Sequence, residues 1–207
     1  MKVLLINGSP KAKGCTYTAL CEIAVELEKQ KIETEIFHLG KDPIRGCTAC
    51  GGCYTTGRCI FNDDVVNEGI EKAKDADGII VGSPVHYASA SGAVTSFLDR
   101  LFYAAGNSLT YKPGAAIVSC RRGGATAAFE QLNKYFTISN MPVVSSQYWN
   151  MVHGNTPDEV RQDLEGMQVM RVLGRNMAWL LKSIQAGKEA GIGLPEQEER
   201  ARTNFIR

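Results

Sequence analysis

KVLLINGSPKAKGCT, residues 2–16, is the stretch that decides the fold. Lys2–Asn7 contains an unbroken Val-Leu-Leu-Ile core, which predicts a strand buried on both faces, as the strands of parallel sheets are. A helix is expected from about Thr16 to Lys29, because apolar residues recur there at helical spacing. A buried strand followed by a short loop and an amphipathic helix is the opening unit of an alternating α/β domain.

The same alternation continues to about residue 150. Helices are expected after Asp63 or Asp64, after Ser91, and over residues 126–139, and strands over residues 32–39, 78–82, 115–120 and 142–147. These five βα repeats predict a doubly wound five-stranded parallel sheet, in the order 2-1-3-4-5, with helices on both faces. We expect one domain over residues 1–186.

A long C-terminal helix is expected next. Thr156-Pro157-Asp158-Glu159 combines an N-cap threonine, a proline at the first helical position and a glutamate at the capping-box position. Apolar residues at helical spacing carry this helix to about Ala186. Residues 187–207 then form a polar C-terminal tail.

The charge balance excludes several classes of partner. The 207 residues contain 23 basic and 22 acidic side chains, a net charge of +1, so neither a nucleic-acid-binding surface nor a basic membrane anchor is expected. No apolar stretch reaches the length of a membrane span. The apolar run after Met1 is too short for a signal peptide, which favours a cytoplasmic location. A small ligand is the remaining expectation.

The first loop has the parts of a phosphate-binding site. In a sheet of this order, ligands bind beyond the carboxyl ends of strands one and three. The loop offers hydroxyls, a lysine, flexible glycine and the free N–H groups of a helix N-terminus; its candidates are Ser9, Lys11, Gly14 and Thr16. It lacks both the Walker A ending and the three spaced glycines of dinucleotide loops, so a monophosphate suits it better. An ordinary capped turn is the alternative.

The second loop, residues 83–92, is long for a strand-to-helix turn. Its proline, its tyrosine and its small residues can bring backbone amides against a planar ring. The two loops together therefore indicate a ligand that carries both a phosphate and a flat ring.

A cysteine-rich loop over residues 46–59 is the other chemical feature. Cys47, Cys50, Cys53 and Cys59 are separated by two, two and five residues, and nearby glycines allow tight bends. Such thiolates can converge on a soft metal or on an iron–sulfur core. Disulfides are disfavoured in the reducing cytosol. Zinc, or reduced thiols without any metal, are the alternatives.

These segments carry a family resemblance. NGSPKAKGCTYT and GSPVHYASASGAVTSFLDR resemble the FMN-binding loops of the NADPH-dependent FMN reductase family, which has a flavodoxin-like fold. With GCTACGGCYTTGRC added, the chain resembles the iron–sulfur flavoprotein branch of that family. The likeness covers about residues 1–150.

The resemblance implies a set of cofactor contacts. The FMN phosphate would be held by Ser9, Lys11, Gly14, Cys15 and Thr16. The isoalloxazine ring would be lined by Pro84, Val85, His86, Tyr87 and Ala88. Because the third loop follows the strand at 115–120, Ser119, Arg121, Gly123 and Gly124 are expected at the pyrimidine side of the ring. Arg121 or Arg122 could instead bind the phosphates of a nicotinamide cofactor, and solvated arginines are the alternative. The family often has asparagine where Cys15 stands, so Cys15 is expected to contribute its backbone N–H. The resemblance also implies that the four thiolates hold a four-iron four-sulfur cluster.

The implied function is an FMN-dependent oxidoreductase. Electrons would pass from NAD(P)H or a reduced electron carrier through FMN to a small-molecule or protein acceptor, with the iron–sulfur cluster as a further redox centre. Because the chemistry takes place at flavin N5, no catalytic side chain is required. A homodimer or homotetramer is expected. The alternatives are a flavodoxin-type electron carrier without its own substrate, although such carriers are typically strongly acidic, and a flavodoxin-like module with a structural zinc.

Overall fold

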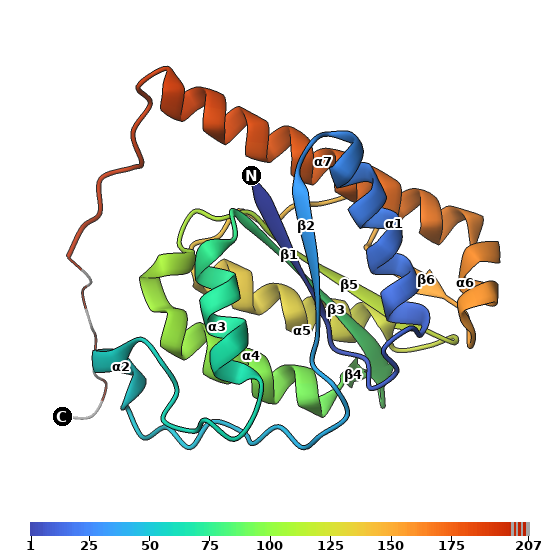
Figure 1. Cartoon of the computed structure of the whole chain (residues 1–207), viewed down its shortest axis with the longest axis horizontal. Coiled ribbons are helices and arrows are strands. Elements are labelled where there is room, and N and C mark those ends of the chain that lie inside the picture. The colour runs from blue at the N-terminus through green and yellow to red at the C-terminus, as the bar shows by residue number, and fades with distance from the viewer. Residues whose placement is uncertain (200, 202, 204, 206–207) are drawn as a thin grey trace.

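A parallel sheet forms the framework of the molecule (Figure 1). The computed structural model describes residues 1–199, 201, 203 and 205. Its strands are β1 (Lys2–Asn7), β2 (Glu33–His38), β3 (Gly78–His86), β5 (Gly114–Cys120) and β6 (Met151–His153), and the short β4 (Ser89–Ala90) pairs antiparallel with β3. The sheet order is β2-β1-β3-β5-β6. Leaving out the hairpin strand β4, this is the predicted 2-1-3-4-5 order, so the flavodoxin-like fold is confirmed.

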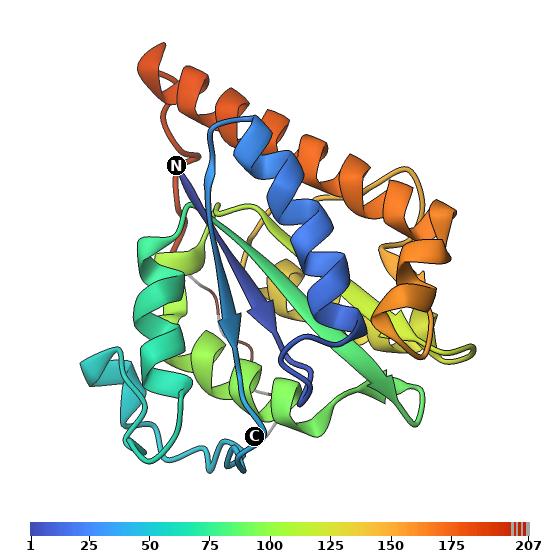
Figure 2. The same ribbon diagram turned by 45° about the vertical axis from the view of Figure 1, so that its right-hand side comes forward.

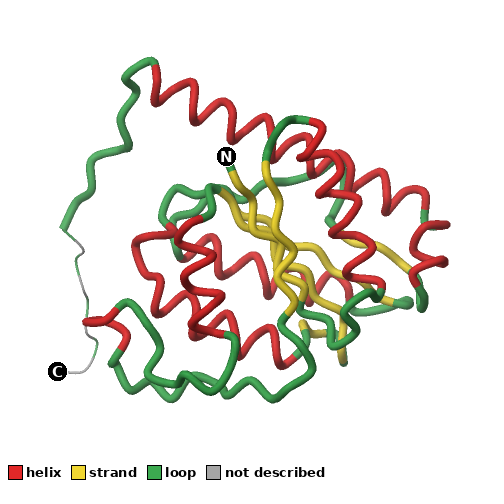
Figure 3. The backbone as a smooth tube through the Cα atoms, viewed as in Figure 1, coloured by secondary structure: helices red, strands yellow, loops and turns green. Residues whose placement is uncertain are grey.

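Helices cover both faces of the sheet (Figure 3). One face carries α1 (Cys15–Lys29), α6 (Pro157–Gln162) and α7 (Leu164–Glu189). The other carries α3 (Val66–Asp75), α4 (Gly92–Ala105) and α5 (Ala125–Ile138), with the short α2 (Cys53–Thr56) and the 3-10 helix η1 (Gly106–Leu109) nearby. Alternate residues of β1 serve the two cores: Leu4 and Ile6 pack towards α3–α5, and Val3 and Leu5 towards α1 and α7.

The strand register brings the functional loops to one level. Asn7, the last residue of β1, pairs with His38 of β2 and with Gly82 of β3. The carboxyl ends of β1 and β2 therefore lie side by side, and β3 continues beyond them. The loops that follow all three strands consequently leave the same edge of the sheet.

The predicted fifth strand over residues 142–147 is wrong. That segment makes only one isolated bridge, between Gly114 and Val143, and the edge strand proper is β6. Between the two pairings the chain leaves β5. The Asn150 side chain replaces part of the missing ladder by donating to the Ala116 carbonyl at 3.0 Å. The sequence therefore indicated the correct edge of the sheet but not the residues that pair with it.

The predicted C-terminal helix over residues 157–186 is interrupted at Asp163. Thr156 caps α6 as expected, with its hydroxyl accepting from the Glu159 N–H at 3.3 Å. Asp163 then caps α7, because its carboxylate accepts from the N–H groups of Gly166 at 3.0 Å and His153 at 2.6 Å. A side chain that binds two backbone donors, one of them on β6, ends one helix and starts the next.

The C-terminal segment leaves the body of the fold after α7. α7 ends at Glu189, three residues beyond the predicted end. Figure 1 shows the segment after it descending beside the molecule, and Gln197 Nε2 donates to the Tyr111 hydroxyl at 2.5 Å. No helix in the described part of the chain combines the length and hydrophobicity needed to cross a bilayer.

Candidate functional site

A cavity of ≈ 250 Å³ lies at the carboxyl edge of the sheet, where the loops after β1, β3 and β5 meet. This is the point between β1 and β3 at which the strand order reverses. Its lining comprises Ser9, Pro10, Lys11, Cys15, Thr16, Pro84, Val85, His86, Ser119, Cys120, Arg121, Gly154 and Asn155. Most of the sequence-predicted cofactor residues are therefore brought together. Pro10, Cys120, Gly154 and Asn155 are additions.

The loop after β1 is folded by its own side chains. The Asn7 amide donates to the Ala12 carbonyl at 3.0 Å and accepts from the Ser9 N–H at 3.2 Å. The Ser9 hydroxyl accepts from the Lys11 N–H at 3.1 Å. A short polar loop with these internal bonds is held in one shape before any ligand arrives.

The N-terminus of α1 is open towards this loop. Gly14 occupies the N-cap position, and no side chain caps the helix. Among the described residues, no hydrogen bond uses the N–H groups of Cys15, Thr16 or Tyr17. A Cβ at Gly14 would lie 3.0 Å from the Lys11 Cβ, so a larger residue would crowd the loop. Free amides at the positive end of a helix, with hydroxyls and a lysine beside them, fit a phosphate group.

Two further contacts brace the loop, and sequence reasoning missed both. His38, at the end of β2, has its Nε2 atom 2.8 Å from the Ser9 carbonyl. The Thr16 and Ser119 hydroxyls lie 2.8 Å apart and join α1 to the end of β5. The sequence did offer one indication for His38. It lies near the end of the strand predicted beside β1, so its side chain could be expected near the loop that follows β1.

The Cys15 side chain points to another loop. Its Sγ atom donates to the Gly154 carbonyl at 3.7 Å, and burial raises the pKa of the Cys15 thiol. The thiol therefore stays protonated and engaged with Gly154. The Cys15 side chain therefore faces Gly154, and the expected contact between the Cys15 backbone N–H and a phosphate stays a prediction.

The second loop is a β-hairpin rather than an irregular loop. β3 runs on to His86 and pairs with β4, and Figure 2 shows this hairpin projecting beyond the sheet. Tyr87 and Ala88 form its two-residue tip with φ of 49° and 59°, the left-handed conformation of type I′ turns. The Gln131 side chain of α5 braces β4 by accepting from the Ala90 N–H at 2.9 Å. Neither tip residue lines the cavity, and the Tyr87 side chain is fully exposed.

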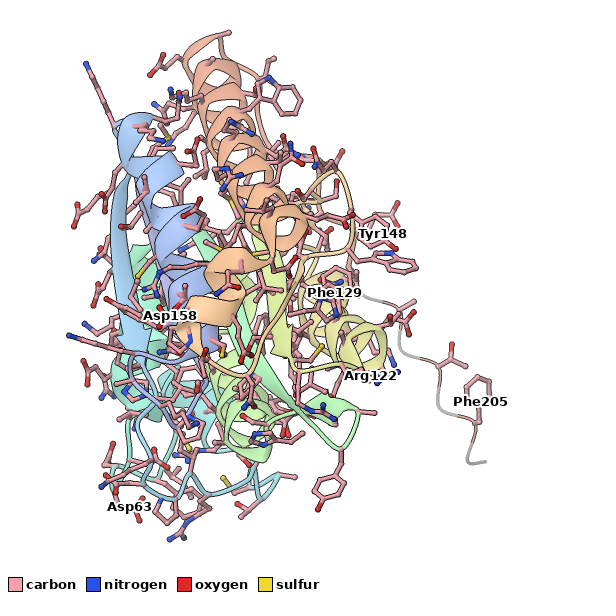
Figure 4. The ribbon with its side chains drawn as sticks, turned by 90° about the vertical axis from the view of Figure 1, so that its right-hand side faces the viewer. Asp63, Arg122, Phe129, Tyr148, Asp158 and Phe205 are labelled. Carbon is pink, nitrogen blue, oxygen red and sulfur yellow. The ribbon has the colours of Figure 1, made fainter. Side chains whose placement is uncertain are left out.

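The third loop divides between two cavities. Ser119 and Arg121 line the first cavity, whereas Arg122, Gly123 and Gly124 line a neighbouring one of ≈ 480 Å³ that includes Tyr148. Figure 4 shows Arg122 and Tyr148 on the same side of the molecule. Gly124 has φ +88°, and a Cβ there would lie 2.6 Å from the Ala88 Cα. Gly124 thus permits contact with the hairpin tip rather than facing the first cavity.

The four loop cysteines line one small cavity of ≈ 60 Å³, together with Tyr54, Ile60, Phe61, Arg100 and Tyr103. All four are free thiols; Cys47 and Cys50 are exposed, and Cys53 and Cys59 are half-buried. Burial, followed by the negative charge that Cys47, Cys50 and Cys59 would carry, raises the pKa of Cys53. The thiols are therefore mutual neighbours, and holding them all deprotonated requires a positively charged group among them.

The donor set of this cavity consists of four cysteine sulfurs. In the described chain, no three Cys, His, Asp or Glu side chains converge on a point that could hold one metal ion. Four thiolate sulfurs around one cavity are ligands that a soft metal or an iron–sulfur core accepts.

Buried side chains from α3 and α4 hold the end of this loop. The Asn67 amide bonds both backbone groups of Cys59, accepting from its N–H at 2.8 Å and donating to its carbonyl at 2.9 Å. Arg100, 2% exposed, donates from Nε to Cys59 Sγ at 3.1 Å and forms an ion pair with the buried Asp64. Asn67 was not predicted from the sequence, because its partners lie in the preceding irregular loop and no capping or turn motif links it to them.

The two cavities are separate within one chain. None of the residues that line the cysteine cavity also lines the cavity at the sheet edge. Figure 1 shows α2 on the far side of α4 from the β3–β4 hairpin, and Figure 4 shows Asp63 and Arg122 well apart. Both loops leave the carboxyl edge as expected, but the cysteine loop extends over α4.

Comparisons with known proteins agree with this geometry. A family model described as NADPH-dependent FMN reductase matches residues 1–156. An iron–sulfur flavoprotein of Methanocaldococcus jannaschii is 33% identical over 193 residues, which cover 89% of this chain and 100% of that protein. A solved structure of RosB with bound 8-demethyl-8-formylriboflavin-5'-phosphate covers 100% of this chain and 92% of its own, with a TM-score of 0.70 at 15% identity. An archaeal flavodoxin covers 88% of this chain and 99% of its own, with a TM-score of 0.58 at 17% identity. The two solved structures support the fold.

Proposed function

Because the chain belongs to the NADPH-dependent FMN reductase family, in its iron–sulfur flavoprotein branch, we propose that it is an FMN-dependent oxidoreductase that moves electrons from NAD(P)H or a reduced carrier to a small-molecule or protein acceptor. The observation that carries this proposal is the cavity at the sheet edge. It joins an open helix N-terminus to the base of a hairpin, as a ligand with a phosphate and a flat ring requires.

The FMN phosphate is assigned to the loop after β1. Ser9, Lys11 and Thr16 line the cavity beside the free N–H groups of α1, and Gly14 keeps the space open. Lysine supplies the charge that balances the phosphate, while the amides supply directed hydrogen bonds. His38 and Asn7 do not contact the phosphate in this assignment. They fix the loop that presents these donors.

The ring is assigned to the base of the hairpin and the end of β5. Pro84, Val85 and His86 offer one wall, and Ser119 with Arg121 offers another. Bound FMN would supply hydride transfer and one-electron transfer. A positive side chain such as Arg121 near the pyrimidine edge would stabilise negative charge on the reduced ring. Tyr87 and Ala88 sit at the tip of the hairpin, so ring contact from them would need a movement of the tip or a second copy of the chain.

The cysteine loop is assigned to a four-iron four-sulfur cluster held by Cys47, Cys50, Cys53 and Cys59. Support comes from the single cavity that all four line and from the apolar and aromatic side chains around it. Apolar and aromatic neighbours of a redox centre lower the polarity around it and help to set its potential. The name of the Methanocaldococcus relative is consistent with this assignment.

The separate linings of the two cavities support a homodimer or homotetramer. Electron exchange between cluster and flavin needs proximity, and one chain holds the two sites apart. Tyr103 and its aromatic neighbour Tyr54 both line the cysteine cavity. Their side chains are exposed, Tyr103 to 54% and Tyr54 to 74%. An exposed aromatic surface beside a redox centre is suited to a subunit contact.

Cofactor counting with a visible spectrum tests the function. Anaerobically purified protein is expected to contain about one FMN and about four irons per chain, with flavin bands that bleach on reduction. NADPH and a chemically reduced ferredoxin are added to separate samples. Bleaching by NADPH identifies the nicotinamide donor, and bleaching by ferredoxin alone identifies a carrier. Protein that takes up no FMN after reconstitution overturns the proposal.

A further inference from the structure

The Arg100 side chain is buried and lines the cavity that the four loop cysteines share. Its five hydrogen bonds match the number of N–H donors that a guanidinium has. Nη1 donates to the Arg45 carbonyl at 3.1 Å, and Nη2 donates to the Phe61 carbonyl at 3.3 Å. These carbonyls flank the cysteine run on either side. One side chain therefore ties together the two ends of the loop.

The remaining donors fix the guanidinium and reach a sulfur. Nη1 and Nη2 both bond the Asp64 carboxylate, with the Nη2–Oδ1 distance at 3.1 Å. The side chains of Arg100 and Asp64 are 1% and 7% exposed, so the pair is shielded from water. With its plane held in this way, Arg100 aims Nε at Cys59 Sγ, 3.1 Å away. A bidentate carboxylate is an effective means of orienting an arginine.

We propose that Arg100 is a positioning residue that closes the cysteine loop and donates a hydrogen bond to the Cys59 sulfur, raising the reduction potential of the cluster bound there. The proposal rests on the cluster assignment made above. A hydrogen bond to a ligating sulfur withdraws electron density from it, so the reduced, more negative cluster is favoured. Asp99, the neighbour of Arg100, has a different role, because it accepts a hydrogen bond from the Tyr135 hydroxyl at 2.5 Å.

Two residues of this region distinguish a role in fixing the backbone of Cys59 from a role in changing the reduction potential of the cluster. Asn67 holds Cys59 through its backbone N–H and carbonyl and contributes nothing to the sulfur. Arg100 reaches the sulfur itself. Asn67→Ala should therefore make the Cys59 backbone more mobile without changing the electron density on its sulfur. Arg100→Lys keeps a positive charge beside Asp64 but cannot serve both carbonyls, the carboxylate and the sulfur.

The test measures the cluster potential in reconstituted holoprotein with FMN bound. Arg100→Lys should shift the potential to a more negative value at unchanged FMN content. Asn67→Ala should lose iron to a chelator faster while its potential stays at the wild-type value. Arg58 lies in the cysteine loop and forms an exposed ion pair with Glu71 of α3. Arg58→Gln removes this pair and should match the wild type in both measurements. Equal potentials for Arg100→Lys and the wild type, or equal shifts in Arg100→Lys and Asn67→Ala, would overturn the tuning role.

A second measurement needs no cluster. In metal-free full-length protein, Cys59 of Arg100→Lys should be alkylated roughly tenfold faster than in the wild type, because a charge-assisted hydrogen bond no longer holds the loop closed. Equal alkylation rates would overturn loop closure by Arg100. If wild-type protein takes up no iron, the cluster assignment and the tuning role fall together, and the alkylation rates alone decide loop closure. If Arg100→Lys does not fold, Asp64→Asn replaces it, with a smaller shift in the same direction expected because the guanidinium loses its anchor.

Discussion

The cavity at the sheet edge and the cysteine cavity leave the same edge of one sheet, yet they are built by different means. The first is made mainly of backbone and short side chains at the ends of β1, β3 and β5, whose mutual register places them. The second is a stretch with little regular structure, held through Arg100, Asp64 and Asn67. The comparison teaches that the sheet positions the flavin-type site, whereas a few buried polar side chains position the cysteines. The first site should therefore tolerate single side-chain losses better than the second.

The largest expected effect tests the dependence of the cysteine region on one side chain. Arg100→Leu leaves the Asp64 carboxylate buried without its partner, so the free energy of unfolding should fall by about 3–5 kcal/mol. Urea denaturation followed by circular dichroism measures this loss. Arg58→Gln is the control, because both members of the Arg58–Glu71 pair are half-exposed, and it should cost less than about 1 kcal/mol. Equal losses in the two variants would remove the contrast between the regions.

A smaller loss of stability is expected in the sheet-edge region, where the backbones of Gly8 and Gly82 lie in close contact. Gly8 N–H donates to the Gly82 carbonyl at 2.9 Å, and a Cβ at Gly8 would overlap the Val94 side chain and lie 2.9 Å from the same carbonyl oxygen. Gly8→Ala should lower the free energy of unfolding by about 1–3 kcal/mol and weaken FMN binding. Gly92→Ala, where nothing lies within 4 Å, should leave both unchanged or raise stability by less than about 1 kcal/mol.

Substitution of a single phosphate contact should have a still smaller effect. Lys11→Met removes one charge from a site that keeps its backbone amides, so FMN should bind roughly tenfold more weakly, a loss of about 1.4 kcal/mol. Riboflavin, which lacks the phosphate, should bind the variant and the wild type equally. Fluorescence titration of apoprotein gives both dissociation constants. An equal weakening for riboflavin would place Lys11 near the ring instead of the phosphate.

The smallest change in stability is expected for the ion pairs that Glu35 of β2 forms with Lys2 of β1 and Lys72 of α3. Hydrogen bonds from Lys2 and Lys72 lower the pKa of Glu35 below its ordinary value of 4.5. The stabilisation from these pairs is therefore present above about pH 4.5 and is lost as the pH falls through the lower, folded-state pKa. Glu35→Gln should reduce stability by less than about 1 kcal/mol at neutral pH, and the difference from the wild type should vanish in acid. Denaturation at a series of pH values measures it, and a difference that persists at the lowest pH would contradict the prediction.

Sequence reasoning succeeded wherever a local pattern has one structural solution. The continuous apolar run of β1, the N-cap Thr156 and the alternation of strands and helices led to the observed sheet order. It failed where a distant contact overrode the pattern. Asp163 interrupts the C-terminal helix because its carboxylate binds the His153 N–H, and the edge strand shifts to residues 151–153 while Asn150 bridges to β5.

The same division runs through the sites. The position of Ser9, Lys11 and Thr16 at the sheet edge could be predicted from strand order, because loops that follow parallel strands meet at one edge. Tyr87 and Gly124 could not, since the hairpin carries Tyr87 away from the cavity and Gly124 packs against the hairpin tip. His38 and Asn67 were missed for the opposite reason: nothing adjacent to them in sequence indicates the carbonyls and amides that they bind.

The amino-acid sequence by itself determined the α/β alternation, the family and the two chemical features, a phosphate-type loop and four closely spaced thiols. Only the tertiary structure decided which residues share a cavity, that the two cavities share no lining residue, and which buried donor faces the Cys59 sulfur. The physical reason is range. Periodicity, capping and loop composition act over a few neighbouring residues, whereas Arg100 is 41 positions from the sulfur to which it donates and is brought there only when α4 packs beside the cysteine loop.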